Sequence, residues 1–115
     1  MSAGYHHFII EQGATFAQTL TLKDSNGALI NLTSFTGDMQ FRTNPSADTI
    51  LQISTANGRM VVGGVAGTLT LTVSATDTAA LEATDGVFDL EITSGGGVVT
   101  RLIEGTYSIR RNITR

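Results

Sequence analysis

The sequence contains no cysteine, no tryptophan and a single proline, and only 15% of its 115 residues are charged. Without cysteine, the chain has neither a disulfide scaffold nor a thiolate zinc site. An average domain is roughly 25% charged, and here threonine, serine and glycine fill the difference. A neutral, hydroxyl-rich surface costs less to desolvate than a charged one and therefore suits contacts with other proteins.

The charge and hydropathy pattern argues against two classes of partner. A dedicated nucleic-acid binder needs a basic face, and this chain has a net charge of −3. No apolar run approaches the roughly 20 residues of a membrane span.

The first residues lack the basic and apolar regions of a secretory signal, so we expect a protein made and kept in a cytoplasm, or released by lysis. The length fits one domain over residues 1–115.

Short alternating segments separated by turns fill the chain. The clearest covers residues 68–73, where Leu69, Leu71 and Val73 alternate with threonines. Ser74 and Asp77 resemble a helix capping box and predict one short helix near residues 75–82. Other strands are expected over residues 5–11, 15–22, 38–42, 50–54, 59–62, 87–93, 98–104 and 106–113. About 7–9 short strands with regular turns predict an all-β fold, an antiparallel sandwich or barrel.

The charges of residues 87–104 predict the register of a hairpin. Arg101 is expected on the outer face, which Asp89 and Glu91 share. A loop of three residues, 95–97, puts Arg101 directly opposite Glu91, whereas a two-residue loop puts it opposite Leu90, on the core face. We therefore predict the odd-length loop and a surface ion pair of Glu91 with Arg101, worth under about 1 kcal/mol. Asp89 and Glu91 share a face as a catalytic pair of carboxylates would, but an ion pair with Arg101 explains their presence better than catalysis does.

No residue pattern indicates an enzyme, a cofactor site or a metal site. His6 and His7 are adjacent, so on a strand they point to opposite faces and do not chelate one metal together. The glycine-rich residues 63–67 and 95–97 lack the lysine and the long helix that phosphate binding requires. We therefore predict no catalytic, cofactor-binding or metal-ligating residue.

The C-terminal run from residue 107 to residue 115 is the candidate protein interface. It is long, ends without a turn, and can lie at a sheet edge, where an unpaired ladder accepts a neighbour. Arginine is enriched at interface centres, and the chain has six arginines and one lysine. The alternative is a solvated edge whose arginines prevent pairing. The predicted interface residues are Tyr107, Ile109, Arg110, Arg111, Ile113 and Arg115.

Several long segments resemble small structural proteins of tailed bacteriophages: HHFIIEQGATFAQTLTLKDSNGALINLTSFT, GTLTLTVSATDTAALEATDGVFDLEIT and VVTRLIEGTYSI. That group is similar to the immunoglobulin-like N-terminal domain of phage baseplate upper proteins, which anchors receptor-binding modules to the tail. The resemblance implies an immunoglobulin-like sandwich and a virion protein of the tail, baseplate or a fibre adaptor. Its implied partners are other virion structural proteins in a homo-oligomeric or symmetric multicopy assembly. The chain ends where the longer proteins continue, so no receptor-binding extension is expected.

Two other functions stay open. A capsid decoration (cement) protein has the same general features, and copy number separates the two: hundreds of copies indicate decoration, and a few to a few dozen indicate the tail. A module that binds host glycans needs exposed aromatic side chains, and the absence of tryptophan and the presence of only two tyrosines, Tyr5 and Tyr107, argue against it.

Overall fold

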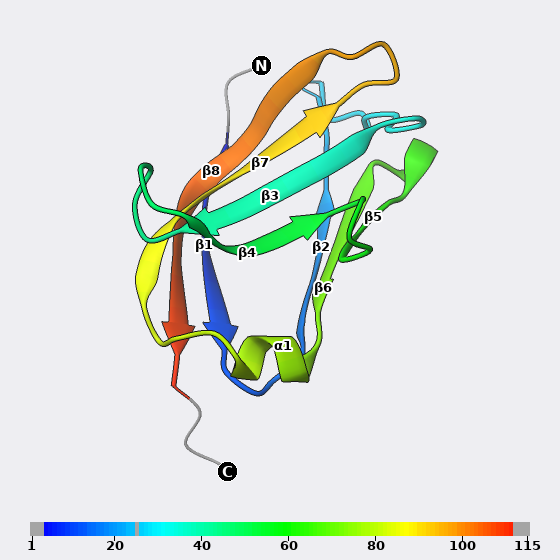
Figure 1. Ribbon diagram of the computed structural model, residues 1–115. Coiled ribbons are helices and arrows are strands. Elements are labelled where there is room, and N and C mark those ends of the chain that lie inside the picture. Colours follow the sequence, from blue (N-terminus) through cyan, green and yellow to red (C-terminus); the bar gives the residue numbers. More distant parts are fainter. Residues whose placement is uncertain (1–3, 25, 112–115) are drawn as a thin grey trace.

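The chain forms two β-sheets that pack face to face, as a computed structural model of residues 4–24 and 26–111 shows (Figure 1). The five-stranded sheet has the order β1 (Gly4–Glu11), β8 (Val99–Arg110), β7 (Asp85–Thr93), β3 (Thr36–Arg42) and β4 (Thr49–Ser54). The three-stranded sheet has the order β2 (Phe16–Thr21), β6 (Thr68–Val73) and β5 (Met60–Val62). The predicted β-sandwich is therefore confirmed.

Alternation of apolar and polar residues places the core between the sheets. Met39 and Phe41 of β3 are fully buried, as are Leu69 and Leu71 of β6. Burying each such side chain stabilises the fold by about 1.5–3 kcal/mol. The ring of Phe41 stacks on Phe88 with centroids 5.4 Å apart, so aromatic contacts tie β3 to β7 in the middle of the sandwich.

The hairpin of β7 and β8 has the predicted odd-length loop. The Ser94 N–H donates to the Val98 carbonyl over 2.9 Å, which closes a loop of residues 95–97. Gly97 has a φ of 89°, a left-handed conformation that favours glycine. Glu91 and Arg101 are direct cross-strand neighbours. The predicted three-residue loop and the placement of Arg101 opposite Glu91 are therefore confirmed.

Strand β8 differs from the prediction, because it is one continuous strand and not two. Gly105, which the sequence suggested as a break, lies inside it. A side chain at Gly105 would collide with the backbone of His6. Glycine therefore lets β1 lie close against β8 rather than ending the strand. The β1–β8 pairing is parallel, in a sandwich that was expected to be antiparallel throughout.

Two connections carry the chain between the sheets at the same end of the sandwich. Residues 12–15 join β1 to β2, and helix α1 (Ala75–Ala79) lies between β6 and β7. The Ser74 hydroxyl accepts from the Asp77 N–H over 3.2 Å, which confirms the predicted cap. The helix is shorter than the predicted 75–82. A three-residue 3-10 turn, Gly64–Ala66, was not predicted.

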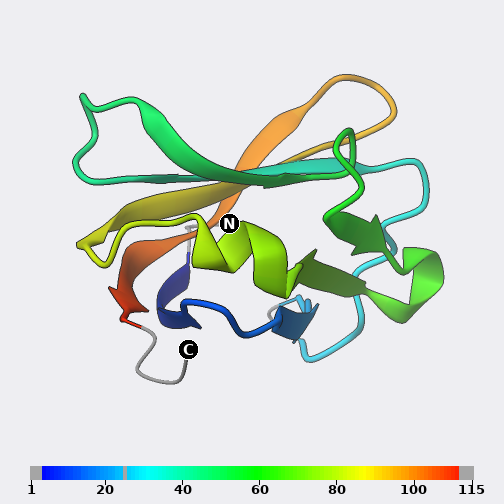
Figure 2. The same cartoon turned by 60° about the horizontal axis from the view of Figure 1, so that its bottom comes forward.

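Thr78 of α1 ties these two connections together. Its side chain is fully buried. Its hydroxyl donates to the Ala14 carbonyl over 2.8 Å and accepts from the Gly13 N–H over 3.1 Å. Figure 2 shows α1 beside the β1–β2 connection. One hydroxyl therefore fixes both crossovers relative to each other.

Tyr107 has a buried hydroxyl with no hydrogen-bond partner among the described residues. Its burial, together with the charge of Asp85, raises the pKa of that hydroxyl. Because an unsatisfied buried polar group costs about 1–3 kcal/mol, Tyr107→Phe is expected to leave the free energy of unfolding unchanged or to raise it by about 1 kcal/mol. Urea denaturation measures this. A loss of more than about 1 kcal/mol would show that the hydroxyl has a stabilising partner.

Candidate functional site

The predicted C-terminal interface is wrong for two of its residues. Tyr107 is fully buried and Ile109 is 4% exposed, so both belong to the core. Strict alternation from the outward Arg101 would place both on the outer face. A bulge at Leu102 shifts the register by one residue, and a one-residue shift reverses the face of every later side chain. The bulge is therefore the reason that Tyr107 and Ile109 face inward.

Strand β8 is also not the sheet edge that was expected. It lies between β1 and β7, and both of its ladders are paired. Arg110 and Arg111 are exposed at its end and stay candidate contacts. Ile113 and Arg115 lie outside the described residues. The open edges of the five-stranded sheet are β1 and β4.

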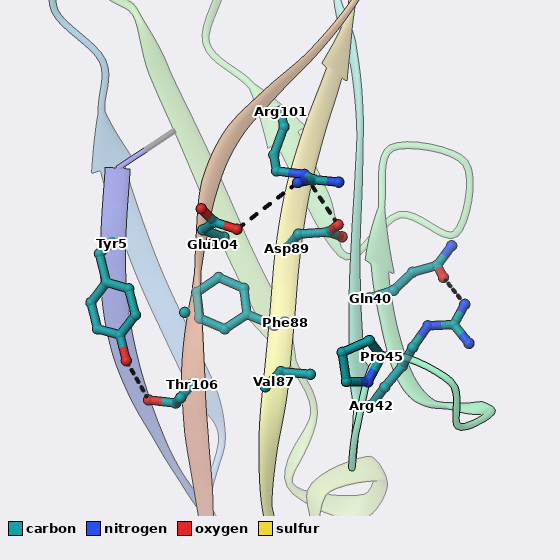
Figure 3. A pocket seen from close by; sticks show the side chains of 11 residues that line it. Tyr5, Gln40, Arg42, Pro45, Val87, Phe88, Asp89, Arg101, Glu104 and Thr106 are labelled. Carbon is teal, nitrogen blue, oxygen red and sulfur yellow. Dashed lines mark hydrogen bonds and ion pairs between the residues drawn. The ribbon is translucent and has the colours of Figure 1, made fainter. Parts of the chain in front are cut away.

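The predicted ion pair of Glu91 with Arg101 does not form, although the two residues are opposite each other. The Arg101 Nε lies 3.5 Å from the Asp89 carboxylate, and its Nη1 lies 3.9 Å from the Glu104 carboxylate. Figure 3 shows the guanidinium group between these two carboxylates. The bulge brings Glu104 opposite Asp89, so Arg101 reaches two carboxylates there. Such exposed pairs add under about 1 kcal/mol each.

His6 and His7 are placed apart, as their adjacency predicts. The His6 ring contacts the Phe8 ring with centroids 4.3 Å apart. The Nδ1 of His7 lies 2.7 Å from the Thr106 hydroxyl on the outer face. Across residues 4–24 and 26–111, no three side chains of His, Cys, Asp or Glu come together in a way that could hold a metal ion.

The outer face of the three-stranded sheet carries no charge from its strands. None of β2, β5 and β6 contains a charged residue. Thr19 lies directly opposite Thr70, and Thr21 lies opposite Thr68. We call this surface the threonine face; it consists of Ala17, Thr19, Thr21, Val61, Thr68, Thr70 and Thr72. The strands of this sheet therefore present an outer surface of threonines and small apolar residues with no charged side chain.

The outer face of the five-stranded sheet has the opposite character. We call it the charged face, because it carries Asp38, Arg42, Asp89, Glu91, Arg101 and Glu104. Asp38 and Glu91 lie directly opposite each other. The Asp38 carboxylate accepts from the side-chain amides of Gln40 and Gln52, over 3.1 and 2.9 Å. These amides compensate part of the repulsion between the two carboxylates.

A shallow hollow of about 550 Å³ lies on the charged face (Figure 3). The bottom of the hollow is formed by two small side chains, those of Val87 and Thr106, which are opposite each other in the β7–β8 register. Tyr5 of β1 borders it on one side, and Arg42 of β3 borders it on the other. We call this feature the sheet-face hollow. The sequence did not predict it, because it depends on the register of four strands.

A further ion pair fixes the start of α1 to the three-stranded sheet. The Arg59 guanidinium lies 2.8 Å from the Asp77 carboxylate. The hydrogen bond from Arg59, followed by the one that involves Ser74, lowers the pKa of Asp77 below its usual range. Both groups have structural partners, so this pair positions the helix rather than a substrate.

The described part of the chain contains no helix with the length and hydropathy needed to cross a membrane.

No family model matches the chain, and no curated protein matches it in sequence. A solved structure of the extracellular domain of the voltage-gated sodium channel beta4 subunit has a similar fold, with a TM-score of 0.52. The alignment covers 98% of this chain and 97% of that chain, at 5% sequence identity. At this identity the likeness shows the fold alone. The chain is an immunoglobulin-like β-sandwich.

Proposed function

We propose that the chain is a non-enzymatic structural protein of a tailed-bacteriophage virion, made in the bacterial cytoplasm. In this proposal it is a tail, baseplate or fibre-adaptor component that binds other virion proteins. The resemblance of its long sequence segments to small phage structural proteins supports the placement. The observation that carries the binding role is the threonine face, which exposes Thr19, Thr72 and Val61 without a charged strand residue.

The physical argument is the cost of removing water. Threonine hydroxyls and methyl groups cost less to desolvate than charged groups, and the core of a protein interface is depleted in charge. A sheet face with paired threonines also presents many stiff, β-branched side chains, which lose little entropy on contact. In a symmetric particle each contact can be weak, because many copies act together.

A multicopy arrangement has a parallel in the fold. The sodium channel beta4 domain is described as forming parallel homodimers that explain its role in cell–cell adhesion. That statement concerns the channel domain. It supports the proposal as an example of association between copies of an immunoglobulin-like sandwich.

The decisive experiment introduces charge on the threonine face. Thr19→Lys combined with Thr72→Lys is expected to reduce incorporation into purified particles by about tenfold or more, because two lysines must be desolvated at the contact. Incorporation is measured by quantitative mass spectrometry of particles from cells that supply the variant in place of the wild type. Both threonines are exposed, so thermal stability is expected to change little.

The matched control is Thr36→Lys with Thr49→Lys, the same change at two exposed strand threonines of the other sheet. It is expected to leave incorporation at the wild-type level. Equal incorporation of both double variants would refute the contact through the threonine face. Absence of the wild-type chain from particles would refute the virion function itself. The same measurement gives the copy number, and hundreds of copies would indicate capsid decoration.

The arginines at the end of β8 are a second predicted contact. Arg110→Ala with Arg111→Ala is expected to leave the free energy of unfolding within about 0.5 kcal/mol of the wild type, because both side chains are exposed. Assembly into particles is expected to weaken. Unchanged incorporation would show that Arg110 and Arg111 face solvent in the particle and contact no other virion protein.

A further inference from the structure

We propose that the sheet-face hollow binds a neutral sugar ring, which packs on Tyr5 and hydrogen-bonds to Asp89 and Arg101. The site is separate from the threonine face, since it lies on the other sheet. Its volume of about 550 Å³ falls within the 300–1,000 Å³ that is usual for small-ligand sites. The proposal goes beyond the assembly function and does not depend on it.

The charge of the hollow favours a neutral ligand. Its lining contains two arginines, Arg42 and Arg101, and two carboxylates, Asp89 and Glu104, so the formal sum is 2 − 2 = 0. Arg42 donates to Gln40 over 2.7 Å and to the carbonyl of Ala47, and Arg101 lies between the two carboxylates. An ionic ligand therefore meets no unbalanced charge, and it would lose its own hydration to bind.

The carboxylates nevertheless keep the capacity to accept hydrogen bonds. Charge-assisted hydrogen bonds are normally about 2.7–2.9 Å long, whereas Arg101 lies 3.5 Å from Asp89 and 3.9 Å from Glu104. Lone pairs on both carboxylates therefore remain open to hydroxyl donors. A guanidinium that is only loosely paired also keeps N–H groups for hydroxyl acceptors. Vicinal hydroxyl groups supply both kinds of partner.

Besides these charged groups, the hollow is lined by the ring of Tyr5 and by Pro45, which give it apolar contact surface. The sequence composition argued against a sugar site because aromatic residues are few, but Tyr5 is 74% exposed and does supply such a ring. Its hydroxyl lies 3.4 Å from the Thr106 hydroxyl, which places the phenol on the β8 side. Figure 3 shows the ring standing beside the floor of the hollow and opposite Pro45. A rigid aromatic ring of this kind gives contact area at low entropic cost. Pyranose rings combine a C–H face for the ring with hydroxyl edges for the polar groups.

A peptide fits less well at this position. The backbone groups of β7 and β8 are already paired on both sides, so a peptide cannot add to the ladder there and loses the main-chain contacts that usually bind extended segments. Only side chains offer contacts on the face of a sheet. A compact ligand rich in hydroxyl groups makes better use of them.

The experiment is an NMR titration of the ¹⁵N-labelled chain with the methyl glycosides of glucose, galactose, mannose and N-acetylglucosamine. At least one is expected to give saturable shifts at Gly105, Thr106 and Val87, with a dissociation constant on the order of 1 mM. Tyr5→Ala and Asp89→Asn are each expected to weaken binding about tenfold. Tyr5→Phe keeps the ring and is expected to bind as the wild type does.

Val61→Ala is the matched control, because Val61 is exposed on the threonine face. It is expected to leave the titration unchanged. The proposal would be overturned by no saturable shift with any glycoside, by binding that Tyr5→Ala does not weaken, or by binding of methyl glucuronide as tight as that of the neutral glycosides. Saturable binding of a peptide at the same residues, with no glycoside bound, would also overturn it. The particle-incorporation result is independent of each of these.

Discussion

Thr78→Val is expected to lower the free energy of unfolding by about 2 kcal/mol, although valine has nearly the same shape and is more apolar. The hydroxyl of Thr78 bonds to Gly13 and Ala14 in the connection between β1 and β2. Valine would leave that N–H and that carbonyl without their partner. Because the buried side chain joins the two crossovers, its loss is expected to loosen the end of the sandwich where the chain changes sheets.

Two variants separate the hydroxyl from the packing. Thr78→Ser keeps the hydroxyl and loses one methyl group, so it is expected to cost less than Thr78→Val. Thr76→Val changes an exposed residue of the same helix and is expected to stay within about 0.5 kcal/mol of the wild type. Urea denaturation gives all three values. A serine variant less stable than the valine variant would show that packing, and not the hydroxyl, holds Thr78 in place.

The two sheets divide the surface chemistry of the protein. The three-stranded sheet presents a neutral, stiff surface of threonines, whereas the outer face of the five-stranded sheet carries charged side chains and the hollow. Such a division suits the adaptor role that we propose, because one face can be covered by an assembly while the other stays accessible. The proposals for the two faces can therefore be tested on one particle without interfering with each other.

The parts of the fold that were predictable depend on local pattern. Residues 68–73 form β6 with the predicted bounds, because apolar and threonine residues alternate there without interruption. The placement of Arg101 opposite Glu91 was also predictable, since burying an arginine costs far more than lengthening a loop. The cap at Ser74 was predictable because side chain and backbone lie within four residues of each other.

The inward orientation of Tyr107 and Ile109 and the absence of the predicted Glu91–Arg101 ion pair have one cause, which is the bulge at Leu102. Without it, the register set by Arg101 would pair Val87 with Gly105, and Tyr107 would face outward. With it, Val87 pairs with Thr106, and Tyr107 faces the core. No local pattern marks Leu102, between Arg101 and Ile103, as the residue that the bulge inserts. The burial of Tyr107 and the pairing of Val87 with Thr106 in the hollow both follow from that one extra residue.

The order of strands in the sheet was also beyond the sequence pattern. A long C-terminal strand that ends in arginines is compatible with a sheet edge, but β1 pairs along it. Parallel pairing joins residues about a hundred positions apart, and no turn between them specifies the register. The one local signal was Gly105, and it has two meanings: a break in a strand, or a close approach of another backbone.

Gly105→Ala is expected to have the largest effect on stability, lowering the free energy of unfolding by about 3 kcal/mol and the melting temperature by roughly 10 °C. A Cβ atom at this buried position would meet backbone atoms of His6, which cannot turn away as a side chain can. Strand β1 must therefore move off β8. Phe8 and Ile10, which are 2% and 0% exposed, would lose part of their burial.

Calorimetry and amide hydrogen exchange check this prediction together. The amides of β1 are expected to lose protection in Gly105→Ala before those of β3, because only β1 depends on the close approach at Gly105. Gly96→Ala is the matched control, since a Cβ there meets only the Ser94 hydroxyl, at 3.9 Å. If Gly105→Ala and Gly96→Ala have the same melting temperature, the packing of β1 against β8 does not require the absence of a side chain at Gly105. Selective loss of protection in β1 would instead show that one glycine fastens the first strand to the last.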